Sequence, residues 1–203
     1  MAQDPRFSLT DTPLYRLANA LSRWVTVSCL WLICSIPLIT IGAATKAAFA
    51  VFQSDEDLGI WKIFFRAFRA DFSRITGLWL LTAVLEILLG LDVLFYRQLF
   101  PREDVILVGV TLVLGNLLLH FFRFGCFCAG NGILSFQALL KNTVATLAAC
   151  FPVVGIATAM DMAAGILLIR IPYLLFLIIL LPGLFANIHC QLIRSFLRHC
   201  SAG

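Results

Sequence analysis

The stretch Cys34-Ser-Ile-Pro-Leu-Ile-Thr-Ile-Gly-Ala-Ala-Thr-Lys46 decides the fold, because it interrupts the first of five apolar stretches. Pro37 lacks the N–H group that a helix interior uses, and Gly42 lowers helix propensity. Non-helical backbone at membrane depth persists only where protein or a water-filled cavity covers it. The stretch therefore predicts a membrane protein whose first hydrophobic segment, residues 25–52, is broken and packed against other parts of the chain.

The composition indicates a chain surrounded by lipid. Hydrophobic residues make up 61% of the 203 residues and charged residues 13%, about half the usual charged share. We expect a single integral membrane domain over residues 1–203 and no cleavable signal peptide, since residues 1–12 contain no apolar core. The basic residues are few and lie beside apolar stretches, so nucleic acid is excluded as a partner.

The apolar pattern predicts an all-α membrane protein with four to five transmembrane helices. Residues 1–23 form an amphipathic helix that leads into the broken segment. Four further membrane helices are expected at residues 75–95, 105–122, 143–160 and 171–188. Each is long enough to cross a hydrocarbon core of about 30 Å at about 1.5 Å per residue.

Residues 58–74 have the pattern of an amphipathic helix in the membrane interface. Aromatic residues recur on one face, and Lys62, Arg66 and Arg69 lie on the opposite face. Such a helix places its aromatic side in the lipid and its basic side on lipid phosphates. The bilayer is therefore the first expected partner.

The distribution of Lys and Arg separates two topologies. If all five segments cross the membrane, nine of the basic residues lie on one side and six on the other. If the first segment enters and returns on the same side, the numbers become twelve and three. The second arrangement obeys the positive-inside rule better and places both termini in the cytoplasm, but the first segment is also long enough to span.

The chain resembles the YesL-like family of bacterial integral membrane proteins. The resemblance is carried by Trp31-Leu-Ile-Cys-Ser-Ile-Pro-Leu-Ile-Thr-Ile-Gly-Ala-Ala-Thr45, by Phe64-Phe-Arg-Ala-Phe-Arg-Ala-Asp-Phe72 and by Leu181-Pro-Gly-Leu-Phe-Ala-Asn187. Shorter matches are Leu91-Asp92, Arg123-Phe124 and Leu140-Lys-Asn-Thr143. The family is a domain of unknown function, and its genes often lie beside carbohydrate importers. The resemblance thus implies the bacterial cytoplasmic membrane and an accessory role in sugar uptake or its regulation.

Polar residues within the apolar segments are the candidates for a functional site. Glu86 lies near the middle of residues 75–95, where an ionised carboxylate is expensive. Asn116 and His120 share one face of the helix expected at residues 105–122, and Arg123 continues that face just beyond its end. Of the three, Asn116 lies closest to Glu86 in depth along the helix axis. Asp92, near the outer interface, is a further candidate through its family match. For each, a role in helix packing or in an ion pair is the alternative.

The sequence bears on three classes of function. A non-catalytic accessory protein with a membrane partner such as a sugar importer fits the resemblance and the basic helix. A small solute or ion transporter fits the broken segment with Pro37, Thr40, Gly42 and Thr45, together with Glu86. We expect no enzyme, cofactor or metal site, because no nucleophile–base pair or metal-ligand spacing occurs and the three histidines are scattered. The small size is compatible with a homodimer.

Overall fold

The computed structural model describes residues 12–54, 59–99, 104–129, 135–170 and 181–202. This part of the chain is helical and contains no strand, which confirms the all-α prediction. Its elements are α1 (Pro13–Cys34), the 3₁₀ turn η2 (Leu38–Thr40), α2 (Ile41–Gln53), α3 (Ile60–Arg69), α4 (Phe72–Leu99), α5 (Asp104–Ala129), α6 (Phe136–Ala149), α7 (Phe151–Arg170) and α8 (Leu181–Ala202).

Three of these helices are long and apolar enough to cross a membrane. They are α1, α4 over Phe72–Tyr96 and α5 over Val108–Ala129. The pair formed by α6 and the first half of α7 passes the same test, but its two helices meet at an angle of 85°. The described residues therefore hold three candidate membrane spans, or four if the bent pair counts as one.

The predicted break in the first hydrophobic segment is confirmed. Helix α1 ends at Cys34, and α2 begins at Ile41 after the short turn η2. The predicted boundary between a leading helix over residues 1–23 and the segment that starts at residue 25 is wrong, because α1 runs through it without interruption. The helix begins where the Thr12 side chain accepts a hydrogen bond from the Tyr15 backbone N–H, as an N-cap does. Residues 1–11 lie outside the described part of the chain.

Helix α2 is the centre of the core. It contacts α1, α3, α4, α5 and α8, and its buried residues include Ala44, Ala47, Phe49 and Val51. Small side chains let neighbouring backbones approach closely. At Gly42 a Cβ atom would lie 2.7 Å from the Trp79 Cβ atom, so α2 and α4 cross here with no room for a larger residue.

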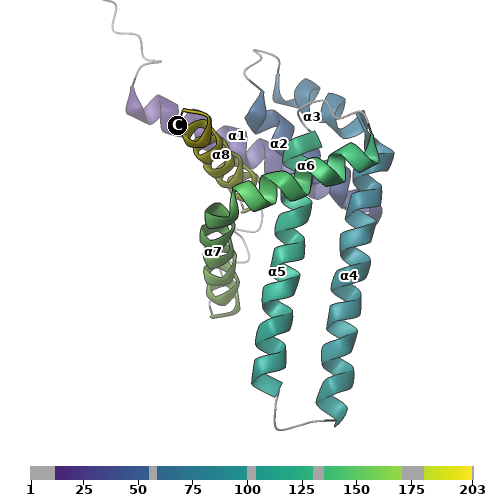
Figure 1. Cartoon of the computed structure of the whole chain (residues 1–203). Helices are drawn as coiled ribbons and strands as arrows, with labels where there is room; N and C mark the ends of the chain where they lie inside the picture. Colours follow the sequence, from purple (N-terminus) through teal and green to yellow (C-terminus); the bar gives the residue numbers. More distant parts are fainter. Residues whose placement is uncertain (1–11, 55–58, 100–103, 130–134, 171–180, 203) are drawn as a thin grey trace, which may run out of the picture.

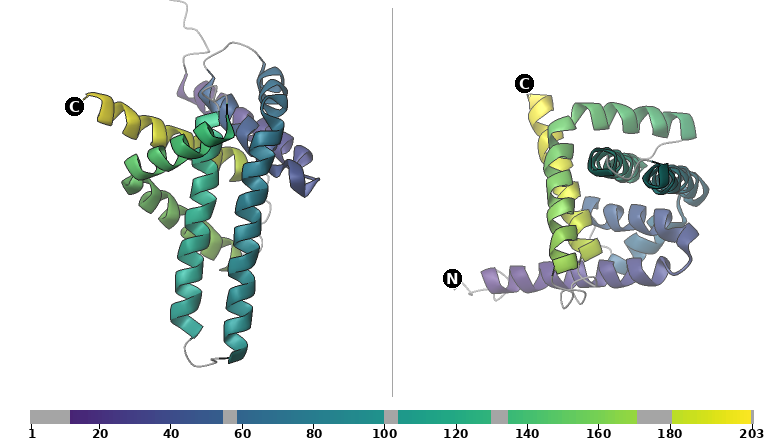
Figure 2. Two further views of the ribbon diagram at one scale, coloured as in Figure 1. Left: turned by 45° about the vertical axis from the view of Figure 1, so that its right-hand side comes forward. Right: turned by 90° about the horizontal axis from the view of Figure 1, so that it is seen from below.

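Helices α4 and α5 form an antiparallel hairpin, and both are longer than the helices expected at residues 75–95 and 105–122. The hairpin extends well beyond the other elements in Figures 1 and 2. Many of its apolar side chains are exposed, among them Val84, Ile87, Leu88, Val110 and Val113. An exposed apolar surface of this extent is suited to lipid or to another membrane protein.

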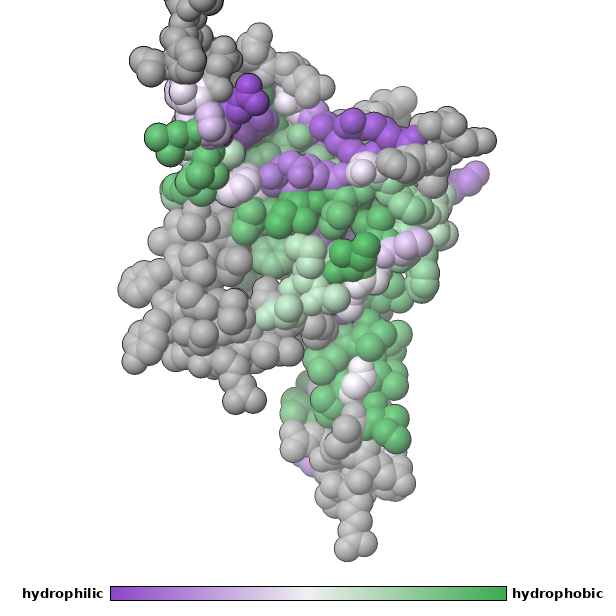
Figure 3. All heavy atoms as spheres, turned by 90° about the vertical axis from the view of Figure 1, so that its left-hand side faces the viewer, coloured by the Kyte–Doolittle hydropathy of each residue, from purple (hydrophilic) through white to green (hydrophobic). Residues whose placement is uncertain are grey.

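Helix α1 lies across one end of the hairpin rather than alongside it. The two views in Figure 2 show α1 and α6 roughly perpendicular to α4 and α5. Helix α1 packs on α2, α3 and α8. Figure 3 shows that hydrophilic residues gather at this end of the molecule, whereas the hairpin below it is mostly hydrophobic.

The predicted single helix over residues 143–160 is wrong. A turn at Cys150 separates α6 from α7, and Pro152 follows directly in the first turn of α7. A proline is tolerated at the start of a helix but not in its interior, which favours a new helix at this point. The predicted helix over residues 171–188 lies partly outside the described residues. Helix α8 begins at Leu181 within it and continues to Ala202.

The predicted helix over residues 58–74 is also divided. Helix α3 ends at Arg69, and Asp71 adopts a positive φ of 55° before α4 begins at Phe72. The Lys46 Nζ atom, on α2, donates a hydrogen bond of 2.7 Å to the Ala70 carbonyl oxygen at this corner. The Arg74 guanidinium donates to the Asp71 carboxylate at 2.6 Å. A cation from the core thus holds the end of α3, a favourable place for positive charge.

Lys46 is one of the basic residues in the two topology counts above, which treat such residues as lying outside the membrane. In the structure its side chain is only 4% exposed. Its ammonium group lies 3.6 Å from the Asp71 carboxylate. Burial lowers the pKa of Lys46, and the negative charge of Asp71 opposes that effect. The residue is therefore part of the core packing rather than of the charged surface.

Candidate functional site

The break in the first segment is held by hydrogen bonds to its own carbonyl groups. The Thr40 hydroxyl donates to the Cys34 carbonyl oxygen and, at 2.7 Å, to that of Pro37. The Trp79 indole N–H, on α4, donates to the Leu38 carbonyl oxygen at 2.9 Å. Of the predicted site residues here, Thr40 therefore caps the turn, and Pro37 is exposed within it. Gly42 permits the close approach to Trp79 described above.

A cavity of about 410 Å³ lies behind this break. Thr45 accepts a hydrogen bond of 3.0 Å from the Trp31 indole N–H, and both residues line the cavity. The opposite wall carries Arg123 and His189. The remaining lining is apolar and aromatic. A cavity of this size and character, with few polar groups, is typical of a small-molecule site.

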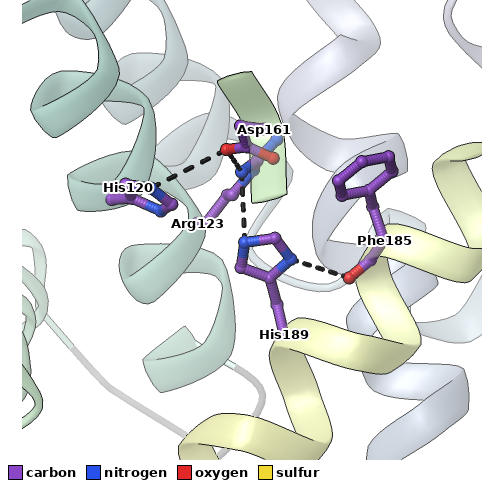
Figure 4. A network of polar contacts seen from close by, with 5 residues as sticks. All are labelled: His120, Arg123, Asp161, Phe185 and His189. Carbon is purple, nitrogen blue, oxygen red and sulfur yellow. Dashed lines mark hydrogen bonds and ion pairs between the residues drawn. The ribbon is translucent and has the colours of Figure 1, made fainter. Parts of the chain in front are cut away.

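A buried polar cluster lies beside the cavity, where α5, α7 and α8 meet. Figure 4 shows Arg123, on α5, between Asp161 of α7 and His189 of α8. The Arg123 guanidinium donates to the Asp161 carboxylate, and one of its nitrogens lies 3.2 Å from the His189 Nε2 atom. His120 Nε2 lies 3.7 Å from the same Asp161 oxygen. Three side chains, two from α5 and one from α8, thus surround the Asp161 carboxylate of α7.

The two histidines of the cluster differ in their hydrogen bonds. The His189 Nδ1 atom lies 2.8 Å from the Phe185 carbonyl oxygen. Because a carbonyl oxygen only accepts hydrogen bonds, Nδ1 must carry the proton and donate it in this contact. This contact fixes the proton on Nδ1 and leaves the lone pair of Nε2 directed toward the cluster. His120 is fully buried, and neither of its ring nitrogens has a hydrogen-bond partner among the described residues.

Glu86 lies apart from this cluster. Its side chain packs against Gly115, where a Cβ atom would lie 2.9 Å from a Glu86 carboxylate oxygen. Glu86, Gly115 and Asn116 line a shallow hollow on the hairpin. The Asn116 Oδ1 atom is buried and has no hydrogen-bond partner among the described residues, although Asn116 is the polar residue closest in level to Glu86. Glu86 is exposed on the hairpin surface and does not line the larger cavity.

The remaining sequence candidates lie on the surface. Asp92 is exposed and borders another hollow of the hairpin. Lys62, Arg66 and Arg69 are all exposed on α3, as the amphipathic pattern predicts. The opposite face of α3 is only partly free for lipid: Phe64 is fully buried and packs on the core, whereas Trp61 is 57% exposed.

Sequence reasoning identified His120 and Arg123 but missed the residues that complete the cluster. Asp161 and His189 are not among the candidate residues that the sequence singles out. The two lie 28 positions apart and belong to different helices, so no local spacing connects them. A charged residue in an otherwise apolar stretch, as Asp161 is, was the one available signal.

Comparison with known proteins finds a similarity to one family over part of this chain. A family model described as "Protein of unknown function, DUF624" matches residues 24–93. That range contains the second half of α1, the break, α2, α3 and most of α4, and it is roughly a third of the chain. No curated protein and no solved structure matches the sequence. Arg123, Asp161 and His189 all lie beyond the matched range.

Proposed function

We propose that this chain is a non-catalytic accessory component of a membrane assembly associated with carbohydrate uptake or its regulation. The association with carbohydrate uptake rests on the resemblance to the YesL-like proteins in the sequence. The structural support comes from the α4–α5 hairpin, which extends beyond the other described elements. A carrier encloses its pathway with several helices at membrane depth, whereas along most of this hairpin the described residues provide only two.

The exposed hairpin and the basic face of α3 are the two surfaces available to a partner. The hairpin offers apolar side chains over most of its length. Lys62, Arg66 and Arg69 offer positive charge at the end where hydrophilic residues gather. An accessory subunit needs both: a membrane contact for affinity and a polar contact that selects the partner.

A small solute transporter is the second candidate, and the cavity of about 410 Å³ favours it. The cavity adjoins the broken segment, as the substrate sites of transporters with broken helices do. The structure does not join Glu86 to it, so the transport hypothesis now depends on Thr45, Arg123 and His189 rather than on Glu86.

The test is purification of the tagged native protein in mild detergent, followed by mass spectrometry of the proteins that co-purify. The accessory function predicts stoichiometric recovery of sugar-importer subunits. The single reversal Arg66→Glu should weaken that recovery severalfold, and Lys141→Glu, an equal charge change at an exposed position on α6, serves as the control.

A second measurement separates the two candidates. An accessory protein should tolerate Thr45→Val, which removes a polar group of the cavity, and lose function when Lys62, Arg66 and Arg69 are reversed together. Recovery of the chain alone, with uptake that depends on the cavity residue Thr45 and not on the basic face, would contradict the accessory function and support a carrier.

A further inference from the structure

We propose that His120, Asp161 and His189 form a binding site for a divalent transition metal ion of the zinc type. The three residues come from α5, α7 and α8, and each offers one ligand atom. These atoms all lie within 4.8 Å of one another. Two imidazoles and one carboxylate are a ligand set that binds zinc and related metals in proteins.

Burial separates this cluster from a chance group of surface residues. The side chains of His120 and His189 are 0% and 2% exposed, and that of Asp161 is 10% exposed. Buried polar groups normally have hydrogen-bond partners. Both ring nitrogens of His120 have none among the described residues. A metal ion bound to Nε2, the nitrogen 3.7 Å from Asp161, would supply a partner for one of these two nitrogens.

His189 is already oriented as a metal ligand. Its Nδ1–H group donates to the Phe185 carbonyl oxygen, so Nε2 keeps its lone pair and faces Asp161 and His120. Metal-binding histidines almost always donate their second ring N–H group in this way, which fixes the ring orientation and the tautomer.

Arg123 occupies the place that the metal ion would take. Its guanidinium contacts Asp161, and one nitrogen lies 3.2 Å from the His189 Nε2 atom. The site thus already directs a carboxylate and an imidazole lone pair at a positive charge. Arg123 also lines the cavity of about 410 Å³, which gives its side chain room to turn away. We infer that Arg123 and the metal ion compete for Asp161, because both positive charges beside one buried carboxylate would repel each other.

The competition connects the metal site to the cavity. When the metal ion is bound, the guanidinium is released from Asp161 and points into the cavity, where it presents a positive charge to a ligand. Three protein ligands also leave a fourth position of the metal ion open to water or to a donor atom from the cavity.

The test uses the whole protein, purified in detergent on an affinity tag without histidine, stripped with chelator and titrated with zinc by calorimetry. We expect one zinc ion per chain. His120→Ala, His189→Ala and Asp161→Asn each remove a direct ligand and should weaken binding by at least about a hundredfold, the upper value for loss of a residue that only supports a ligand. His199→Ala removes the third histidine of the chain and should leave binding unchanged. Arg123→Gln should bind zinc more tightly than the wild type, because it removes the competing charge.

Either of two results would overturn the proposal: no saturable zinc binding by the wild type, or binding that His120→Ala and His189→Ala leave intact. Arg123→Gln with unchanged or weaker zinc affinity would refute the competition. Size-exclusion profiles identify variants that fail to fold. If the variants fail to fold, the visible spectrum of the wild type loaded with cobalt replaces them. Four-coordinate cobalt with imidazole ligands absorbs far more strongly than cobalt in water, so a weak spectrum would contradict the proposed site.

Discussion

Gly183 shows how single residues determine the helix contacts of this protein. Its backbone N–H donates a hydrogen bond of 2.7 Å to the Ser28 hydroxyl on α1. A Cβ atom at this position would lie 2.5 Å from the Trp24 carbonyl oxygen. The backbones of α1 and α8 therefore touch here, 155 positions apart in sequence, and the contact depends on the absence of a side chain.

We predict that Gly183→Ala lowers stability by about 1–3 kcal/mol, the usual cost of forcing extra atoms into a packed contact. The matched control is Gly155→Ala on α7, where a Cβ atom would meet nothing within 4 Å. Thermal unfolding in mild detergent measures both. Equal melting temperatures for the two variants would show that α1 and α8 are not in backbone contact.

The candidate site was predictable only in part, and the reason also lies at this scale. His120 and Arg123 share a helix face, so periodicity alone brings them together. Their partners on α7 and α8 are added by tertiary packing, which sequence spacing does not reveal. Glu86 drew attention as an isolated charge in an apolar segment, but the fold leaves it on the hairpin surface.

At the scale of elements, α1 is the helix whose role the sequence left open. Its length and hydropathy suit a membrane span, and the break after it suits a segment that returns. Both hypotheses use the same residues, so composition does not separate them. In the structure α1 contacts α2, α3 and α8 and lies across the end of the hairpin, an arrangement that a segment returning to its own side would permit. The break itself was predictable, because Pro37 and Gly42 act through the local backbone.

We expect this arrangement to place the start of α1 and the residues after α2 on the same side of the membrane. Single cysteines at Arg16 and Lys62, both exposed, are introduced into a chain without its natural cysteines. Both should react with a membrane-impermeant maleimide only after the cells are permeabilised. A cysteine at Arg102, in the link between α4 and α5, should react in intact cells. Labelling of Arg16→Cys alone from outside would mean that the first segment crosses the membrane once.

At the scale of the whole molecule, the stabilising core and the membrane surface are separated. The fully buried side chains gather around α2, at the end where α1, α3 and α8 meet. The hairpin beyond this core is held mainly by contacts between its own two helices. Hydropathy alone did not predict this division, because the core helix α2 and the hairpin are similarly apolar.

Because the core and the hairpin differ in burial, we predict that a Phe→Ala substitution lowers the free energy of unfolding more in the core than in the hairpin. Phe64 is fully buried against the core, whereas Phe95 on the hairpin is 64% exposed. Phe64→Ala should cost about 3–5 kcal/mol, the range for a buried phenylalanine, and Phe95→Ala well under 1 kcal/mol. Unfolding midpoints in the same detergent give the comparison. A larger loss for Phe95→Ala would place the stabilising contacts in the hairpin instead.

The end of α2 has a consequence for the order of assembly. Its last carbonyl groups accept hydrogen bonds from two arginines: Arg23 of α1 donates to Val51, and Arg194 of α8 donates to Gln53. Arginine near a helix C-terminus satisfies carbonyls that have no partner within the helix. The first arginine is synthesised before α2, and the second follows Gln53 by 141 positions. The carbonyl group at the end of the innermost helix therefore cannot receive its arginine until the ribosome has made α8, so this contact can form only after the hairpin has been synthesised.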